Sequence, residues 1–236
     1  MSERVHLDFG SGGVTVVTLD HPPLNVYDLE MRDALIGALT AVRDVPGVRC
    51  MILRAEGKHF SAGADLSEFG TADTIVEARR IRWDRDPWIT LSELRIPTIA
   101  ELHGYAVGSG LEMSLLCDLR VAADDAVVGL PETKLGMLPA AGGTQSLTRA
   151  VGPHAASPIV LTGRNLDADE AMRRGLVHEV VPRDALEDRT SELATRLTAI
   201  DPVVIRSLKR SLAAAKDLTL GEGLAVERQL ARDLTR

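Results

Sequence analysis

The sequence predicts an α/β fold, and three observations point to it. Short apolar runs of strand length alternate with helical segments, and the pattern turns helical from about residue 143. A chain of 236 residues that is 45% hydrophobic and 26% charged has the composition of a soluble globular protein and can bury a large core. Aromatic residues make up only 3%, so that core must be built from Leu, Val, Ile and Ala. We expect an α/β core over residues 1–195 and a small helical region over 196–236.

The chain is expected to begin with a β-hairpin, because two β-type runs, residues 5–9 and 14–19, flank the turn residues 10–13. Asp28 follows as the candidate N-cap of a helix, since its carboxylate can accept hydrogen bonds from amides of the first turn. This helix presents aliphatic residues on one face: Leu35, Ile36, Leu39 and Val42. Their spacing predicts that this face is buried.

Further strands are expected at residues 48–53, 97–102, 118–122 and 126–130. Residues 74–94 read as a long charged helical stretch that Pro87 interrupts. A glycine-rich turn and the apolar run 111–117 follow the strand at 97–102.

The last third of the chain carries helix signals. Asp184 and Glu187 resemble a capping box ahead of a helix. Asp201 offers an N-cap, with Pro202 at the first helical position. The final segment, residues 220–234, is loosely amphipathic.

Charge and cysteine content exclude several classes of protein. The net charge of −7 argues against non-specific binding to nucleic acid or to anionic membranes. Cys50 and Cys117 lie in apolar runs without metal-type spacing, so they read as core residues, with a disulfide as the alternative. The N-terminus has no apolar signal segment, and no run is long enough to span a membrane. We expect a cytoplasmic protein that binds neither nucleic acid nor membrane.

Three glycine-rich segments carry the candidate chemistry. The first, residues 57–66, joins a strand to a probable helix, and its small residues leave amide N–H groups open to a ligand. The alternative is a plain strand-to-helix turn. The second, residues 103–112, precedes an apolar helix, and amides at a helix N-terminus can stabilise an oxyanion. Its GxxxGxG order does not match a dinucleotide-binding loop.

Two glutamates stand out in these segments. Glu112 lies in an apolar run, where burial of a carboxylate is costly unless it has a partner or a role. The alternative is that it reaches solvent on the outer helix face. Glu132 follows Pro131 in the third segment, residues 129–144, where the helix dipole alone could explain a carboxylate.

Taken together, the three segments resemble the enoyl-CoA hydratase/isomerase (crotonase) family in order and spacing. Residues 20–25 are similar to the opening D-x-P-x-x-N segment of the family, and residues 60–65 and 104–112 to its two oxyanion-hole segments. Residues 130–147 resemble its P-E-x-x-x-G and G-G-T-Q-x-L stretch. The resemblance runs from about residue 14 to 181. It implies a crotonase-like (ββα)n spiral core with a short C-terminal helical region.

The resemblance implies that the chain binds an acyl-CoA thioester, with the carbonyl held by the backbone N–H groups of Ala64 and Ser109. Ser109 departs from the usual glycine, and a serine would be strained there if the site needs a positive φ. The resemblance further implies that Glu112 orients and activates water while Glu132 delivers a proton to C2. One of the two carboxyls should then have a raised pKa, because like charges in a dry site cannot both ionise freely.

The retained pair of glutamates favours hydration of a 2-enoyl-CoA. The alternatives are another crotonase reaction, namely Δ3-Δ2 isomerisation, decarboxylation or thioester hydrolysis, or a non-catalytic acyl-CoA-binding, scaffold or RNA-binding protein. The resemblance implies no metal and no cofactor beyond the coenzyme A of the substrate. Its substrate-binding set is Lys58, Ala62, Ala64, Asp65, Leu66, Gly108 and Ala140. For Lys58 the alternative is an ordinary solvated lysine.

The resemblance also implies an acyl pocket formed by residues 67–95 and a homotrimer or hexamer. Trp83, Trp88 and the arginines at positions 79, 80, 82 and 85 could shape the pocket, or the arginines could form a solvated helix face. The chain ends at Arg236, so we expect a shorter trimerisation region than is typical, without the final helical segment that contacts coenzyme A from a neighbouring subunit.

Overall fold

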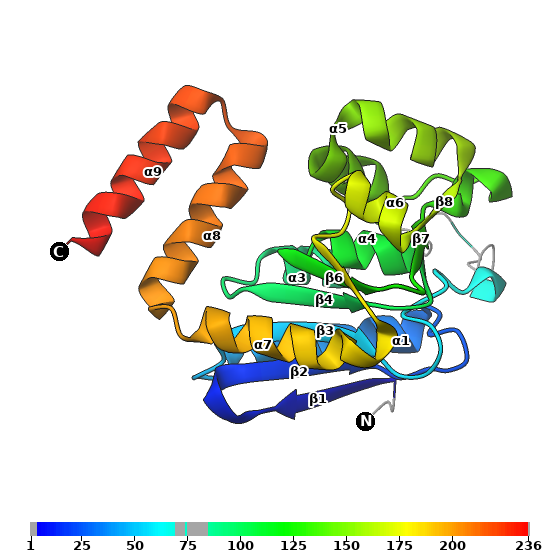
Figure 1. Ribbon diagram of the computed structural model, residues 1–236, viewed down its shortest axis with the longest axis horizontal. Coiled ribbons are helices and arrows are strands. Elements are labelled where there is room, and N and C mark those ends of the chain that lie inside the picture. Colours follow the sequence, from blue (N-terminus) through cyan, green and yellow to red (C-terminus); the bar gives the residue numbers. More distant parts are fainter. Residues whose placement is uncertain (1–3, 69–73, 75–84, 236) are drawn as a thin grey trace.

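The computed structural model describes residues 4–68, 74 and 85–235. Its strands form two sheets (Figure 1). The larger has the order β1-β2-β3-β4-β6-β9 and comprises Val5–Phe9, Val14–Leu19, Cys50–Ala55, Thr98–Leu102, Leu119–Ala123 and Glu179–Val181. The smaller has the order β5-β7-β8 and comprises Tyr105–Val107, Val127–Gly129 and Asn165–Asp167. The chain therefore has the predicted α/β class.

The predicted hairpin and first helix are confirmed. Strands β1 and β2 pair antiparallel around a 3-10 turn at Ser11–Gly13, and every later pairing in the larger sheet is parallel. Helix α1, Leu29–Asp44, begins where the Asp28 carboxylate accepts the N–H of Met31 at 2.7 Å. Its buried face includes Leu35 and Leu39. The hairpin and α1 close one end of the sheet.

The central strands of the larger sheet are buried on both faces, and alternate residues of these strands enter different cores. Met51 and Leu53 of β3 join the main core, whereas Cys50 and Ile52 pack under helix α7, Leu186–Thr198. This two-sided burial explains why β3 reads as a continuous apolar run. Cys50 and Cys117 are free and buried, and burial raises the pKa of both thiols to about 12.

One side of the fold is built by elements that connect the sheet strands. Helix α3, Pro87–Ser92, starts at the predicted break and is capped by Asp86. Helix α4, Ser109–Leu115, is entirely buried and packs with α5, Gly143–Thr162, which Gly152 interrupts. Two 3-10 turns, Leu66–Glu68 and Pro131–Leu135, complete this side.

The C-terminal third contains strands that the pattern did not predict. Helix α6, Ala168–Arg173, lies between β8 and β9, each of which is only three residues long. Such short strands have too few residues for an alternating pattern to show.

The expected capping box at Asp184 and Glu187 is wrong. Asp184 lies in a 3-10 turn, Arg183–Ala185, and α7 has no side-chain N-cap. Glu187 instead pairs with Arg54 of β3, because α7 lies directly on the sheet. The domain boundary predicted after residue 195 falls within this helix.

The last two helices, α8 (Pro202–Asp217) and α9 (Leu220–Leu234), form a hairpin that projects from the body (Figure 1). The predicted N-cap at Asp201 is confirmed, since its carboxylate accepts the N–H groups of Val203 and Val204. A capping box that the pattern did not indicate starts α9 at Thr219 and Glu222. None of the helices in the described ranges has both the length and the apolar composition needed to cross a bilayer.

Candidate active site

The two predicted oxyanion donors lie on segments that follow neighbouring strands. Tyr27 bonds the residues on either side of Ala64: its N–H donates to Gly63 O, and its carbonyl accepts from Asp65 N, both at 2.9 Å. In this parallel bridge the N–H of Ala64 itself points away from Tyr27. Ser109 is the first residue of α4, so its N–H has no acceptor within the helix.

Two glycines bring these amides close together. A Cβ added to Gly63 would lie 3.8 Å from the Ser109 nitrogen and 3.3 Å from the Val107 carbonyl oxygen. Gly63 has a φ of 101° and Gly108 a φ of 54°, conformations that favour glycine. The positive φ thus falls on Gly108, and Ser109 is helical. The strain expected for a serine at position 109 is absent for that reason.

Glu112 is buried rather than solvent-facing. Its side chain lies in the first turn of α4, and the residue is only 2% exposed. One carboxylate oxygen, Oε1, accepts the N–H of Ala141 at 3.0 Å and the N–H of Gly143 at 2.8 Å. A Cβ on Gly143 would lie 2.8 Å from that same oxygen, so the glycine is required for this approach. These contacts fix the orientation of the carboxylate.

Glu132 is held differently. It lies in the 3-10 turn that begins at Pro131. Its Oε1 lies 3.0 Å from the position that a Cβ added to Gly108 would take. Its Oε2 is buried and has no hydrogen-bond partner. Burial raises the pKa of Glu132 above its usual range. The carboxyls of Glu112 and Glu132 therefore border the start of α4 in different environments, one anchored by two amides and the other with an unpartnered oxygen.

Most of the residues predicted to bind coenzyme A lie within the first segment, residues 57–66. Lys58 is exposed in the turn after β3, and Leu66 is 53% exposed. The N–H of Ala62 donates to Leu24 O at 2.8 Å. The Asp65 carboxylate accepts from Ser67 N and Oγ, which lowers the pKa of this carboxyl. Ala140 is exposed beside Ala141.

The structure describes only part of the predicted acyl pocket, residues 67–95. Trp88 is buried in α3 and meets the ring of Tyr27 edge to face, with centroids 4.6 Å apart. Arg85 is half-exposed and pairs with Asp33 at 3.2 Å, as a solvated arginine would. Trp83 and the arginines at 79, 80 and 82 lie outside the described residues.

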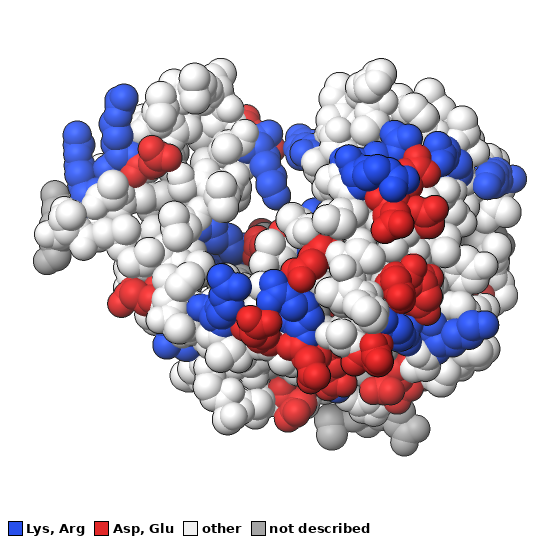
Figure 2. Space-filling model, in the orientation of Figure 1, with Lys and Arg blue, Asp and Glu red and all other residues white. Residues whose placement is uncertain are grey.

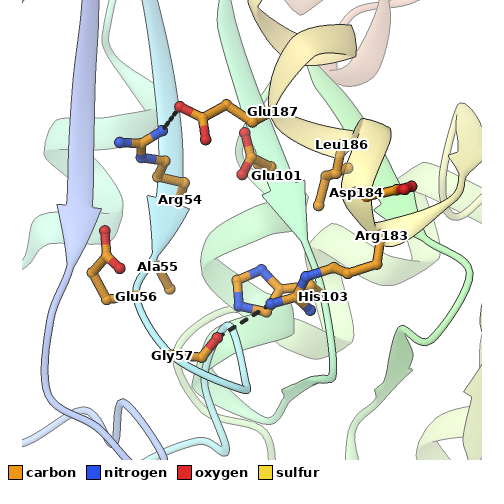
Figure 3. Close-up of a pocket in the computed structure, with 10 residues that line it drawn as sticks. All are labelled: Arg54, Ala55, Glu56, Gly57, Glu101, His103, Arg183, Asp184, Leu186 and Glu187. Carbon is orange, nitrogen blue, oxygen red and sulfur yellow. Dashed lines mark hydrogen bonds and ion pairs between the residues drawn. The ribbon is translucent and has the colours of Figure 1, made fainter.

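A separate polar cavity of about 330 Å³ lies on the face of the sheet that α7 covers (Figure 3). Glu101 and His103 reach it because they continue the alternate positions of β4 that face α7. Both are more than 90% buried, and Glu101 accepts the Thr190 hydroxyl at 2.6 Å. None of the predicted site residues lines this cavity. In the described part of the chain, no cluster of three His, Cys, Asp or Glu side chains could hold a metal.

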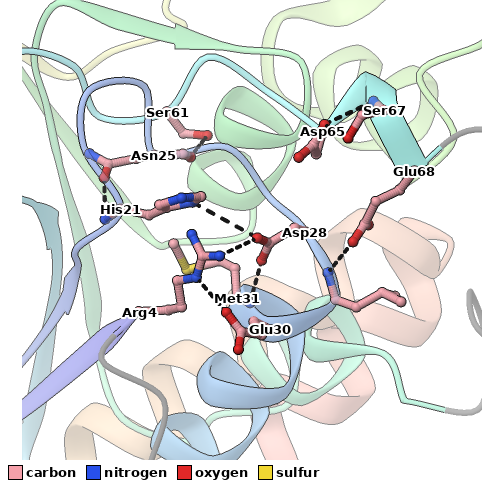
Figure 4. A network of polar contacts seen from close by, with 11 residues as sticks. Arg4, His21, Asn25, Asp28, Glu30, Met31, Ser61, Asp65, Ser67 and Glu68 are labelled. Atoms are coloured by element: carbon pink, nitrogen blue, oxygen red, sulfur yellow. Dashed lines mark hydrogen bonds and ion pairs between the residues drawn. The ribbon is translucent and has the colours of Figure 1, made fainter.

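The sequence patterns gave no role to two buried polar residues, Ser61 within the first segment and Asn25 beside it (Figure 4). Among the described residues, Asn25 is the only non-glycine residue with a positive φ, which is 48°. In the sequence, the signal that could have pointed to Asn25 is its place as the Asn of the D-x-P-x-x-N segment at residues 20–25.

Fold and site together define an α/β enzyme of the crotonase type. The model of the enoyl-CoA hydratase/isomerase family matches residues 10–236. The chain belongs to the enoyl-CoA hydratase/isomerase family.

Individual relatives agree with that membership. The Mycobacterium tuberculosis protein named "Probable enoyl-CoA hydratase echA8" is 38% identical over 221 residues, which span 92% of this chain and 84% of that protein. The 2,3-dehydroadipyl-CoA hydratase of Escherichia coli is 35% identical, with 92% and 85% covered. The crystal structure of an enoyl-CoA hydratase from Bacillus anthracis superposes with a TM-score of 0.92 at 33% identity, covering 98% of this chain and 90% of that one.

Proposed function

We propose that this protein is an enoyl-CoA hydratase that adds water across the 2,3 double bond of a 2-enoyl-CoA thioester. The observation that carries the proposal is the pair of carboxyls, Glu112 and Glu132, at the start of the helix whose first amide is that of Ser109. Hydration needs two proton transfers next to a polarised carbonyl, and this arrangement supplies a group for each.

The reaction proceeds through an enolate-like transition state. The N–H groups of Ala64 and Ser109 hold the thioester oxygen, on which negative charge develops as water attacks C3. Glu112, oriented by two backbone amides, accepts a proton from that water. Glu132, whose raised pKa favours the protonated form, delivers a proton to C2 through the same water or its partner. Proton exchange with solvent restores both carboxyls, so the reaction needs no cofactor beyond the coenzyme A of the substrate.

The names of the relatives support hydration over the other reactions of the family. The relatives reported above are named as hydratases, one of them for 2,3-dehydroadipyl-CoA. In this proposal the exposed Lys58 meets a coenzyme A phosphate as a compact positive charge, and the backbone near Ala62 and Leu66 is the rim of the site.

The proposed assembly is a homotrimer, or a hexamer of two trimers, with a second copy covering the α8–α9 hairpin. Figure 2 shows uncharged side chains over much of this hairpin, with charged ones at its outer end and beside the notch that sets it off from α5. It exposes large aliphatic side chains, including Leu208, Leu212 and Leu220 at 51%, 68% and 80% exposure. Lys209 fixes α8 to the body through Asp118, at 2.7 Å, so the apolar side chains are presented in a fixed orientation. Burial of such side chains favours self-association.

Incubation with crotonyl-CoA tests the proposed reaction. The enoyl-thioester absorbance should disappear while the mass of the thioester rises by one water. An unchanged crotonyl-CoA, together with conversion of a 3-enoyl-CoA at constant mass, would point to an isomerase. Release of free coenzyme A thiol would point to a thioester hydrolase.

A further inference from the structure

Hydrogen bonds to residues 24–27 shape the segment that carries Ala64. Ala62 N donates to Leu24 O at 2.8 Å, and Tyr27 N donates to Gly63 O at 2.9 Å. Asp65 N donates to Tyr27 O at 2.9 Å. Ser61 adds a side-chain bond, because its hydroxyl donates to Asn25 O at 2.7 Å. The direction of the Ala64 amide is therefore set by the path of residues 24–27.

Asn25 fixes that path. Its backbone adopts the left-handed φ of 48°, and its Oδ1 accepts the N–H of His21 at 2.7 Å. Its Nδ2 donates to Glu56 O at 2.8 Å and to His59 O at 2.7 Å, so that Asn25 holds both ends of the turn after β3. Asn25 is 1% exposed, so water cannot replace these bonds cheaply.

Ser61 links the two oxyanion segments to each other. Its N–H donates to Tyr105 O at 2.9 Å, and its carbonyl accepts from Val107 N at 3.0 Å. The first turn of α4 packs directly on it, since a Cβ on Gly110 would lie 2.8 Å from Ser61 Cβ. Its hydroxyl also accepts the N–H of Gly63 at 3.3 Å. Ser61 thus touches the segments of both donor amides.

We propose that Asn25 and Ser61 are positioning residues that aim the Ala64 N–H at the thioester oxygen and set its spacing from the Ser109 N–H. Neither side chain touches substrate. The inference rests on the oxyanion hole of the proposed function and adds the residues that shape it. An oxyanion hole acts most strongly on the transition state. A misdirected Ala64 N–H therefore lowers kcat more than it weakens substrate binding.

Three variants test this inference: Ser61→Ala, Asn25→Gly and, as a matched control, Ser114→Ala. Ser114 is a fully buried serine whose hydroxyl also donates to a backbone carbonyl, Leu111 O at 2.9 Å, inside α4. Glycine at position 25 keeps the left-handed backbone while removing the side-chain clamp. Crotonyl-CoA hydration gives kcat and KM. A 4-(dimethylamino)cinnamoyl-CoA probe reports carbonyl polarisation through the red shift of its absorbance on binding.

Ser61→Ala and Asn25→Gly should lower kcat by roughly 10- to 100-fold with little change in KM, the order of loss that follows from a misplaced group. Both should also shrink the red shift of the bound probe, and Ser114→Ala should do neither. Wild-type kcat and red shift in Ser61→Ala, even with a lower melting temperature, would overturn the inference. If Asn25→Gly does not fold, Ser61→Ala decides. A wild-type protein that shifts the probe but does not hydrate crotonyl-CoA would contradict the hydratase assignment alone.

Discussion

At the scale of single residues, the site separates two chemically identical side chains by their surroundings. Glu112 was predictable as a candidate because a carboxylate stood in an apolar run. Its partners, the amides of Ala141 and Gly143, lie at the start of α5 and just before it, about thirty residues away, and no local pattern links them to it. The difference between the two carboxyls arises from tertiary burial, which the sequence alone does not show.

The raised pKa of Glu132 has a consequence for the pH dependence of activity. As the proton donor to C2, Glu132 works only when protonated, so kcat should fall as the pH rises through its pKa. Because burial raises that pKa, this alkaline limb should lie above the pH at which an ordinary glutamate loses its proton. A pH profile of kcat for the wild type and for Glu132→Gln measures it. Persistence of the same limb in Glu132→Gln would assign it to another group.

His103 should make stability depend on pH. Burial, and secondarily Arg183, lowers the pKa of His103 to about 4. The unfolded chain therefore binds a proton below about pH 6.5 that the folded chain takes up only near pH 4, and stability is lost as the pH falls through this window. The loss should reach about 3 kcal/mol in full and about 2 kcal/mol between pH 7 and pH 5.

Urea unfolding of the wild type and of His103→Gln at pH 7 and pH 5 tests this. Burial raises the pKa of the neighbouring Glu101, which acts in the opposite sense, so only the difference between the two proteins isolates His103. Equal losses of stability in both would show that His103 does not titrate as described.

At the scale of elements, strong local signals were predictable and weak ones were not. The hairpin follows from its turn residues, and α1 and α8 follow from their N-cap residues, Asp28 and Asp201. The effects of all these residues are local. Strand β5 was read as part of a turn because it has three residues and is defined by its pairing with β7. The capping motif at Asp184 failed since the path of the chain onto the sheet outweighs a local hydrogen bond.

The turn that starts α4 should be the element most sensitive to substitution. Gly108→Ala places a Cβ 3.0 Å from Glu132 Oε1 and forces alanine into a φ of 54°. We expect a loss of about 1–3 kcal/mol in stability and of about 100-fold in kcat. Gly175→Ala is the matched control, because Gly175 has a φ of 74° but open space around its Cβ. It should lose a similar stability and keep its kcat. Equal losses of kcat in both variants would show that the Gly108 turn has no specific effect on catalysis.

At the scale of the whole molecule, the larger sheet divides the protein into two chemically distinct sides. The main core and the segments of Ala64 and Ser109 lie on one side, and α7 with its polar cavity lies on the other. Interleaved charges cover α7, where Arg189 pairs with Glu179 and Glu192 (Figure 2). The hairpin exposes several large aliphatic side chains, including Leu208, Leu212 and Leu220, which is why it carries the proposed contact with a second copy.

Assembly can be tested on that hairpin. Sedimentation of the wild type should give a multiple of the 25.4 kDa chain mass, three or six in the proposed assembly. The double variant Leu208→Glu/Leu212→Glu should shift the protein toward the monomer, because two charges cannot be buried in an apolar contact. Leu161→Glu, at an equally exposed leucine of α5, should not. A monomeric wild type would contradict the proposed assembly.

The most direct test of the central claim is the rate of crotonyl-CoA hydration in the wild type, in Glu112→Gln and in Glu132→Gln, measured side by side. Glutamine keeps the shape of each side chain but can neither accept nor deliver the proton. The account predicts rapid hydration by the wild type and a loss of about 100-fold or more in each variant, with the thioester still bound. Hydration at the wild-type rate in either variant would show that the pair does not carry the reaction.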